Sequence, residues 1–174
     1  KALNGLNVPV VLLDDAGKLK GKSWTIQVEA FDRDLKRIKT CVYRGISIKN
    51  SVERAGDFTL KEEETDGRLL LLTVKLFSGD EMLHSTFYWL NYEKEQGALL
   101  NLPKTTLTFQ KKSGTIIVKN KGRVPAVGVM VENVSHAREF LVSDSVFWLE
   151  PDEEREIKAN ILEGISVKAW NGGV

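Results

Sequence analysis

The sequence has a single cysteine, Cys41, and only two histidines among its 174 residues. One cysteine cannot form a disulfide within the chain, and it excludes a zinc site built from several cysteines. Apolar runs are also short, because the leucine run Leu69–Leu72 ends at Thr73, whereas a helix that spans a membrane needs about 20 apolar residues. No glycine-rich phosphate loop or dinucleotide fingerprint occurs. The sequence therefore predicts no bound metal, no cofactor and no membrane-spanning helix.

The sequence also lacks an excess of charge of either sign. Its 25 Lys and Arg residues face 24 Asp and Glu residues, and the charges balance within each half of the chain, residues 1–96 and residues 97–174. Nucleic-acid-binding domains usually carry a strongly basic face. The composition thus provides no basis for a nucleic acid or an anionic membrane as a partner.

Helical periodicity is missing, and apolar residues recur at every second position instead, as on a strand with one buried face. One row runs from Trp24 to Ala30 and a second from Leu70 to Leu76, each followed by a polar turn. Further strands are expected over these ranges: Val8–Leu13, Ile38–Tyr43, Met82–Leu90, Thr105–Gln110, Thr115–Lys119, Ala126–Glu132, Val146–Leu149, Arg155–Ile161 and Ile165–Ala169. Short strands with a turn every 8–12 residues are typical of β-sandwiches.

The alternation of apolar and polar residues is interrupted at the polar stretch Asn91–Gly97, which is the best candidate for a linker. We therefore expect an all-β protein of two tandem immunoglobulin-like antiparallel β-sandwiches, with residues 1–96 in the first and residues 97–174 in the second. The pattern leaves open whether residues 1–60 belong to the same sandwich as residues 65–96.

Acids and histidines are the residues that would carry hydrolytic chemistry. The acidic runs Glu62–Glu64 and Glu150–Glu156 lie at turns, so we expect solvated side chains rather than a desolvated pair in a cleft. His84 lies in an expected strand and His136 in an expected loop, and no Gly-x-Ser-x-Gly elbow accompanies either of them. Neither histidine is therefore a strong catalytic or metal-binding candidate.

The tryptophans are more informative, because aromatic rings fill cores, stack on sugars and anchor interfaces. Trp24 and Trp89 lie in alternating strands and are expected in a sandwich core. Phe147 and Trp148 are neighbours, so on a regular strand their side chains face opposite sides and cannot both enter one core. We therefore expect one of these two side chains at an interface, a loop or the solvent, and we take Trp148 as a site candidate.

Several short motifs in the second half, and one at the end of the first, occur in an order that resembles a known family. The segment Ser143–Glu153 is similar to a Ser-Asp-Asn-aromatic strand that leads into Leu-x-Pro-Gly-Glu. The other motifs are Phe87-Tyr88-Trp89-Leu90, Leu102-Pro103, Asn120-Lys121-Gly122-Arg123-Val124-Pro125-Ala126 and Trp170-Asn171. Together they resemble the C-terminal immunoglobulin-like domains of glycoside hydrolase family 2 enzymes of the β-mannosidase and exo-β-glucosaminidase type. Ser145 and Asp152 depart from that pattern, since the family has Asn and Gly there.

The resemblance implies a role for the chain as well as a fold. In that family the catalytic carboxylates lie on a barrel domain, and a barrel of about 250 residues does not fit in this chain. The chain would then be a non-catalytic accessory part of an exo-glycosidase in carbohydrate catabolism, with the catalytic barrel of the parent chain as its partner. Asp144 and Trp148 would face that barrel or its substrate pocket. The resemblance also favours a periplasmic or extracellular location.

Two alternatives stay open at this point. A stand-alone carbohydrate-binding module would need exposed, coplanar aromatic rings that bind glycan, and a protein-interaction module of the immunoglobulin type would need no hydrolase at all. Glycan binding by the isolated chain would favour the first alternative. A gene without a catalytic barrel would favour the second.

Overall fold

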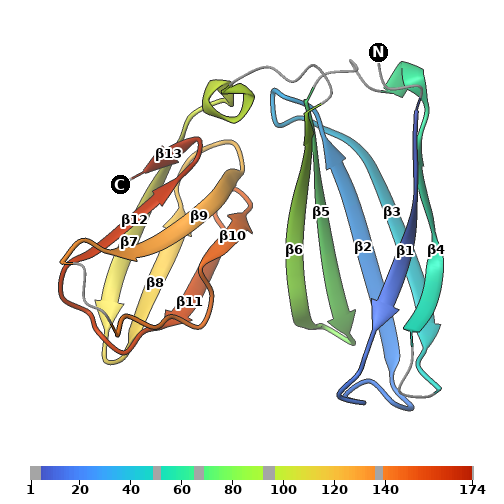
Figure 1. Ribbon diagram of the computed structural model, residues 1–174, viewed down its shortest axis with the longest axis horizontal. Coiled ribbons are helices and arrows are strands. Elements are labelled where there is room, and N and C mark those ends of the chain that lie inside the picture. Colours follow the sequence, from blue (N-terminus) through green and yellow to red (C-terminus); the bar gives the residue numbers. More distant parts are fainter. Residues whose placement is uncertain (1–4, 49–51, 65–68, 92–96, 136–138, 174) are drawn as a thin grey trace. The chain divides into compact units, whose positions relative to one another are not determined.

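The computed structural model describes residues 5–48, 52–64, 69–91, 97–135 and 139–173. The chain divides into two compact units, residues 1–96 and residues 97–174. In the described part the regular elements are thirteen β-strands and two short 3₁₀ turns, η1 (Glu62–Glu64) and η2 (Ala98–Asn101) (Figure 1). The expected all-β class is thereby confirmed. No helix in those ranges is long and apolar enough to cross a membrane.

Unit 1 is built from two antiparallel sheets. Four of its strands form one sheet in the order β3-β2-β5-β6, and the other two pair as β1-β4. The strands are β1 (Leu6–Leu13), β2 (Ser23–Phe31), β3 (Arg37–Ile46), β4 (Val52–Leu60), β5 (Leu69–Ser78) and β6 (Glu81–Asn91). The strand β4 was not expected, because its sequence carries Arg54, Gly56 and Asp57 in place of an unbroken apolar row.

The core of unit 1 lies between these two sheets, and the alternating rows supply it. Ile26 and Val28 of β2 lie beside Leu76 and Val74 of β5 in register, so one face of the larger sheet is apolar. Both sheets contribute to a single cluster of buried residues, which are Val10, Leu12, Leu19, Trp24, Ile26, Val28, Ala30, Phe58, Leu60, Leu70 and Leu72. Residues before position 60 and after position 65 therefore share one core.

The two tryptophans of unit 1 differ in burial. Trp24 is 5% exposed and belongs to the core, as expected. Trp89 is 47% exposed, so its expected place in the core is wrong. Leu70 of the core lies opposite Leu90, and the neighbouring Trp89 points to the other face of the sheet.

Tyr43 of β3 packs its ring against Gly56, where an added Cβ would lie 2.6 Å from the ring. Its hydroxyl donates a hydrogen bond of 2.8 Å to the carbonyl oxygen of Asp57. Burial, followed by the proximity of Cys41 and the charge of Asp57, raises the pKa of Tyr43 to about 12.

We expect Tyr43 to ionise about two pH units above an ordinary tyrosine, because its neutral form is favoured in the folded state. The stability that this group contributes is present below pH 10 and is lost as the pH rises toward 12, since the unfolded chain releases its proton first. An ultraviolet titration of the wild type and of Tyr43→Phe tests this expectation. If the absorbance step that the substitution removes has its midpoint near pH 10, the expectation is wrong.

Unit 2 is a sandwich whose two sheets share the strand β7. The strand order is β10-β9-β12-β13-β7-β8-β11, and the pairing is antiparallel except between β13 and β7. The strands are β7 (Thr105–Lys112), β8 (Thr115–Asn120), β9 (Ala126–Asn133), β10 (Val146–Leu149), β11 (Glu154–Lys158), β12 (Ile165–Ala169) and β13 (Gly172–Gly173). The short parallel pair is a local departure from the expected antiparallel sandwich.

A bulge in β9 sets which residues of unit 2 enter the core. Phe147 pairs with Val129 and Leu149 with Ala126, so Val127 and Gly128 together lie opposite the single residue Trp148. Gly128 has a φ of +59°, and an added Cβ there would lie 2.4 Å from the ring of Trp170. The core cluster consists of Leu107, Ile116, Val118, Ala126, Val129, Val131, Phe147, Leu149, Ile157, Ala159, Ile165 and Val167.

Two buried asparagines connect the loops of unit 2. The Asn171 amide donates to the carbonyls of Pro103 (2.8 Å) and Pro125 (2.9 Å), and its oxygen accepts from the Val127 amide (2.9 Å). Asn120 in turn makes four side-chain hydrogen bonds, to Thr105, Gly122, Val124 and Leu149. Both side chains are fully buried, so these bonds satisfy polar groups that have no access to water.

Candidate functional site

The segment Glu139–Val146 of unit 2 contains the first sequence candidate, Asp144, and is irregular but firmly held. Two hydrogen bonds join Ser143 to Lys158. The Ser143 amide donates to the Lys158 carbonyl at 2.9 Å, and the Lys158 amide donates to the Ser143 hydroxyl at 3.0 Å. Val142 forms a bridge with Ala159. The Asn160 side chain accepts from the Leu141 amide at 2.8 Å and donates to the Glu139 carbonyl. The segment is therefore fixed along the end of β11 by backbone and side-chain bonds together.

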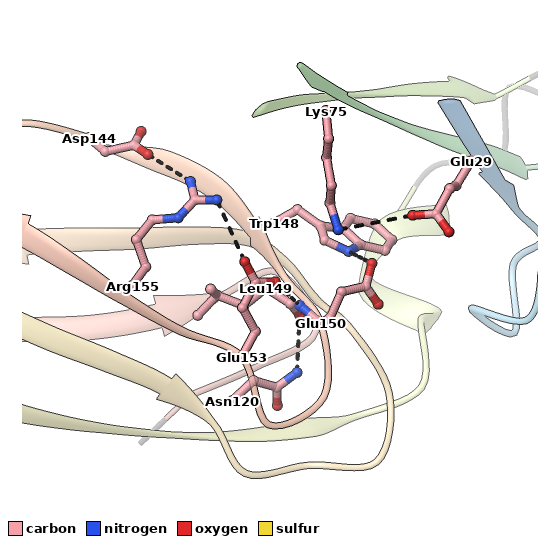
Figure 2. A network of polar contacts seen from close by, with 9 residues as sticks. All are labelled: Glu29, Lys75, Asn120, Asp144, Trp148, Leu149, Glu150, Glu153 and Arg155. Atoms are coloured by element: carbon pink, nitrogen blue, oxygen red, sulfur yellow. Dashed lines mark hydrogen bonds and ion pairs between the residues drawn. The ribbon is translucent and has the colours of Figure 1, made fainter. Parts of the chain in front are cut away.

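Arg155 connects this segment to the core. Its Nη1 lies 2.8 Å from Oδ2 of Asp144, and its Nη2 lies 4.0 Å from Oε1 of Glu153. Figure 2 draws both contacts. The guanidinium also stacks over the Phe147 ring, 4.7 Å from the ring centre. The Arg155 side chain is 14% exposed and that of Asp144 is 40% exposed. The guanidinium is therefore largely shielded from solvent, whereas the carboxylate that it bonds is partly exposed.

Trp148, the second sequence candidate, is 4% exposed and lies outside the core cluster that contains Phe147. Its indole Nε1 donates to Oε1 of Glu150 at 2.9 Å (Figure 2). The two neighbours thus do differ in environment, but neither faces the solvent, which corrects that part of the expectation. A ring this buried does not present a face on which a sugar can stack. Asp144 and Trp148 share no hydrogen bond or ion pair in Figure 2.

The turn after β10 explains one departure from the family pattern. The amide of Glu153 donates to the Glu150 carbonyl at 3.1 Å, and Pro151 occupies the second position of this four-residue turn. Asp152 at the third position has a φ of +62°. This combination matches a type II turn, which favours glycine at that position, as in the family motif. Asp152 thus keeps the geometry of the turn at a cost in backbone energy.

We expect Asp152→Gly to raise the free energy of unfolding by about 0.5–1 kcal/mol, because relief of the left-handed strain exceeds the added chain entropy of glycine. The matched variant Asp152→Val should lower it by about 1–2 kcal/mol, since a β-branched residue fits poorly at positive φ. Equilibrium urea unfolding of the two variants measures both changes. An equal effect of Gly and Val would contradict this account of the turn.

The acids that were expected to be solvated at turns differ in their burial. Glu62–Glu64 form the turn η1, where the Lys61 amide and then the Lys39 ammonium lower the pKa of Glu64. Glu150 and Glu153 are half-buried and bonded within the turn, so the expected solvation is wrong for these two.

His84 is exposed, whereas His136 and residues 92–96 of the expected linker lie outside the described residues. The described part of the chain holds no cluster of three or more metal-ligating side chains.

Two cavities among the described residues lack the pair of acids that a hydrolytic site requires. A cavity of about 430 Å³ in unit 1 has an apolar lining of β1, β2, β4, β5 and β6 residues, without an acid. A hollow of about 340 Å³ in unit 2 contains the single acid Glu154. A glycosidase needs two carboxylates on either side of the scissile bond. Neither cavity therefore provides the pair.

Unit 1 contains a buried acid that the sequence did not predict. Glu29 is 2% exposed, with Nε of Arg37 at 3.0 Å and Nζ of Lys75 at 4.0 Å (Figure 2 draws the contact with Lys75). Thr73 lies opposite Glu29 in register and is also buried. The alternation of β2 places Glu29 on the face opposite the apolar row, and it does not indicate that the basic partners on the neighbouring strands bury this acid. Two opposite charges make this a structural ion network.

The exposed aromatic rings of β6 lie on both faces of its sheet. Tyr88 and Trp89 are 53% and 47% exposed, but as neighbours on β6 they point to opposite faces of the sheet. Phe87 shares the face of Trp89, with ring centres 6.3 Å apart and planes tilted by 34°. These rings do not form a flat platform, so the structure gives the carbohydrate-binding alternative no support.

Comparison with known proteins gives matches at the level of structure. The chain superposes on the exo-chitosanase CsxA of Amycolatopsis orientalis with a TM-score of 0.66 and 15% sequence identity, over 95% of this chain and 24% of that one. It superposes on the β-D-mannosidase of Dictyoglomus thermophilum with a TM-score of 0.64 and 16% identity, over 95% of this chain and 20% of that one. The chain shares the fold of this part of both enzymes.

Because the match covers 95% of this chain, it includes residues of both units. The expected resemblance to enzymes of the β-mannosidase and exo-glucosaminidase type is thereby confirmed as a likeness of fold. The chain spans about a quarter of the length of these enzymes or less. No family model matches the sequence, and no curated protein is significantly similar to it.

Proposed function

We propose that this chain is the non-catalytic accessory part of a glycoside hydrolase family 2 exo-glycosidase of the β-mannosidase type, at its C-terminal end. The observation that carries the proposal is the match of 95% of the chain to about a quarter or less of two enzymes, an exo-chitosanase and a β-D-mannosidase. The motifs that resemble the family pattern support the same proposal.

The chemistry of the described residues is consistent with this role. The two cavities within the described residues lack a pair of carboxylates, and the half-buried Glu150 and Glu153 of unit 2 are bonded within their turn. On this proposal the bond-breaking acids lie on a catalytic barrel elsewhere in the parent chain, and that barrel is the partner of the two sandwiches. The segment that contains Asp144 then faces the barrel or its substrate pocket.

The test uses the longest polypeptide that contains this sequence, with and without residues 1–174. We expect the complete protein to hydrolyse aryl β-D-mannosides or aryl β-D-glucosaminides, and the truncated protein to be less stable or less active. A complete protein that folds, lacks any barrel and hydrolyses none of these substrates would contradict the proposal. Glycan binding by the isolated chain would instead favour a binding module.

A further inference from the structure

The two sheets of unit 1 differ in width, so the smaller sheet leaves part of the larger one uncovered. The larger sheet has the strand order β3-β2-β5-β6, whereas the smaller contains only β1 and β4. Because β4 lies beside β3, the smaller sheet covers the β3 side of the larger one, and β6 lies on the far side of the unit (Figure 1). The inner face of β6 is consequently left open.

Tyr88 of β6 marks this opening. It lies opposite Leu72 of the core, so its side chain is on the inner face of the larger sheet. Inner-face side chains of a sandwich are normally buried between the two sheets, yet Tyr88 is 53% exposed. The apolar cavity of about 430 Å³ lies next to it and is lined from both sheets, by Val10 and Phe58 on one side and Val74 on the other.

The strand β1 provides a free backbone edge beside the same cavity. Among the strands that the structure describes, β1 pairs only with β4, so its other edge offers backbone donors and acceptors for a further strand. Pro9 lacks an amide hydrogen and removes at most one of these bonds. A small apolar molecule would fill the cavity and leave the edge unpaired, whereas an extended polypeptide satisfies both.

The residues directly before β1 indicate where such a strand comes from. The sequence there is Leu3-Asn4-Gly5-Leu6, and Gly5 has a φ of +82°. Asn-Gly between apolar residues is the strongest local signal for a two-residue hairpin turn, in which both turn positions need positive φ. Since β4 occupies one edge of β1, an antiparallel strand that ends at Leu3 has only the free edge to pair with.

We propose that unit 1 takes up a seventh strand, which is the segment of the parent polypeptide that leads into Lys1 and is joined to β1 by the Asn4-Gly5 turn. This strand pairs with the free edge of β1, fills the apolar cavity and covers Tyr88. The proposal does not depend on the proposed function, because it rests on the pairing and burial within unit 1 alone.

The turn also sets the register of the added strand. A two-residue loop places Leu3 opposite Leu6 and Lys1 opposite Val8. The second and fourth residues before Lys1 then lie opposite Val10 and Leu12, which are both buried in the core. These two positions of the parent sequence are therefore expected to be apolar.

The first experiment compares the 174-residue chain with a longer polypeptide that begins about twelve residues before Lys1, which is enough for one strand. Hydrogen exchange is resolved to the amides of β1. We expect the amides on the free edge to exchange about 100-fold more slowly in the longer polypeptide. Unchanged exchange of β1 would overturn the proposal.

The second experiment introduces a charge at the open face with Tyr88→Lys, in both polypeptides. The control is Val42→Lys, because Val42 is 41% exposed and lies opposite Gln27 on the outer face of the same sheet. We expect neither variant to change exchange of β1 in the 174-residue chain. In the longer polypeptide, only Tyr88→Lys should raise it, by about tenfold, while Tyr88→Phe retains the protection. Equal effects of Tyr88→Lys and Val42→Lys would contradict burial of Tyr88 by the strand.

Two further results would overturn the choice of occupant. One is protection of β1 in the 174-residue chain that rises with protein concentration together with a dimer in sedimentation, since a second copy would then hold the edge. The other is a parent sequence with charged residues at the second and fourth positions before Lys1, or one that starts fewer than about four residues before it. A synthetic peptide of the twelve preceding residues, added to the 174-residue chain, should reproduce the protection.

Discussion

Replacing Asn171 with Asp is expected to lower the free energy of unfolding of unit 2 by about 3–5 kcal/mol. The amide of Asn171 donates to two carbonyls, those of Pro103 and Pro125, and is fully buried. An aspartate places a negative oxygen against one of these carbonyls and leaves both without their donor. The loss should be smaller at low pH, since a protonated carboxyl regains one donor.

Urea unfolding measures this loss, and hydrogen exchange assigns it to unit 2. The control is Asn160→Asp, in which an exposed asparagine also bonds to the backbone in both directions. Solvent replaces those bonds, so we expect a cost of about 1 kcal/mol or less. If Asn171→Asp costs no more than this control, the buried amide does not hold the loops together.

The second large effect is expected for Gly128→Ala, at about 3–4 kcal/mol. A Cβ at this position lies 2.4 Å from the Trp170 ring, and the φ of +59° is unfavourable for any residue with a side chain. Two costs therefore add, the left-handed backbone and the displacement of a packed indole ring.

Gly114→Ala separates these two costs. Gly114 has a φ of +70° but nothing within 4 Å of an added Cβ, so this variant reports the backbone cost alone, about 1–2 kcal/mol. Thermal unfolding of both variants should show the larger loss for Gly128→Ala, together with a changed fluorescence of Trp170. Equal losses would mean that the ring moves aside without cost.

Alternation along the sequence predicted the strands whose one face is buried, such as β2 and β5. It could not choose a face for β6, because Phe87, Tyr88, Trp89 and Leu90 offer a large apolar group to either side. Trp89 was consequently misplaced. It also could not locate β4, since the register of that strand with β1 shifts beside Gly56 and its exposed residues include the charged Arg54 and Asp57.

The candidate site depends on contacts between residues that are distant in the sequence, and these contacts cannot be inferred from the pattern of residues along the chain. The opposition of Phe147 and Trp148 was predictable from strand geometry, but the bulge at Gly128 that accommodates Trp148 depends on pairing between distant strands. Arg155 looked like one basic residue in an acidic run, and only tertiary structure brings it over Phe147 and beside Asp144.

The motifs that carried the family resemblance are structural in this protein. Asn120 and Asn171 are buried and bonded to loop backbone, and Asp152 occupies the left-handed position of a turn. Such residues determine how the chain folds and carry no information about a substrate. For this reason the fold could be predicted from them, whereas a substrate could not.

The most direct test of the central claim is the hydrolysis rate of the purified 174-residue chain, measured beside its full-length parent on aryl β-D-mannoside and aryl β-D-glucosaminide. We predict that the isolated chain folds into β-sheet structure and releases no aryl alcohol above the uncatalysed rate, while the parent turns over one of the two substrates. Turnover by the isolated chain that persists through purification and is abolished by mutation of its own acids would contradict the account.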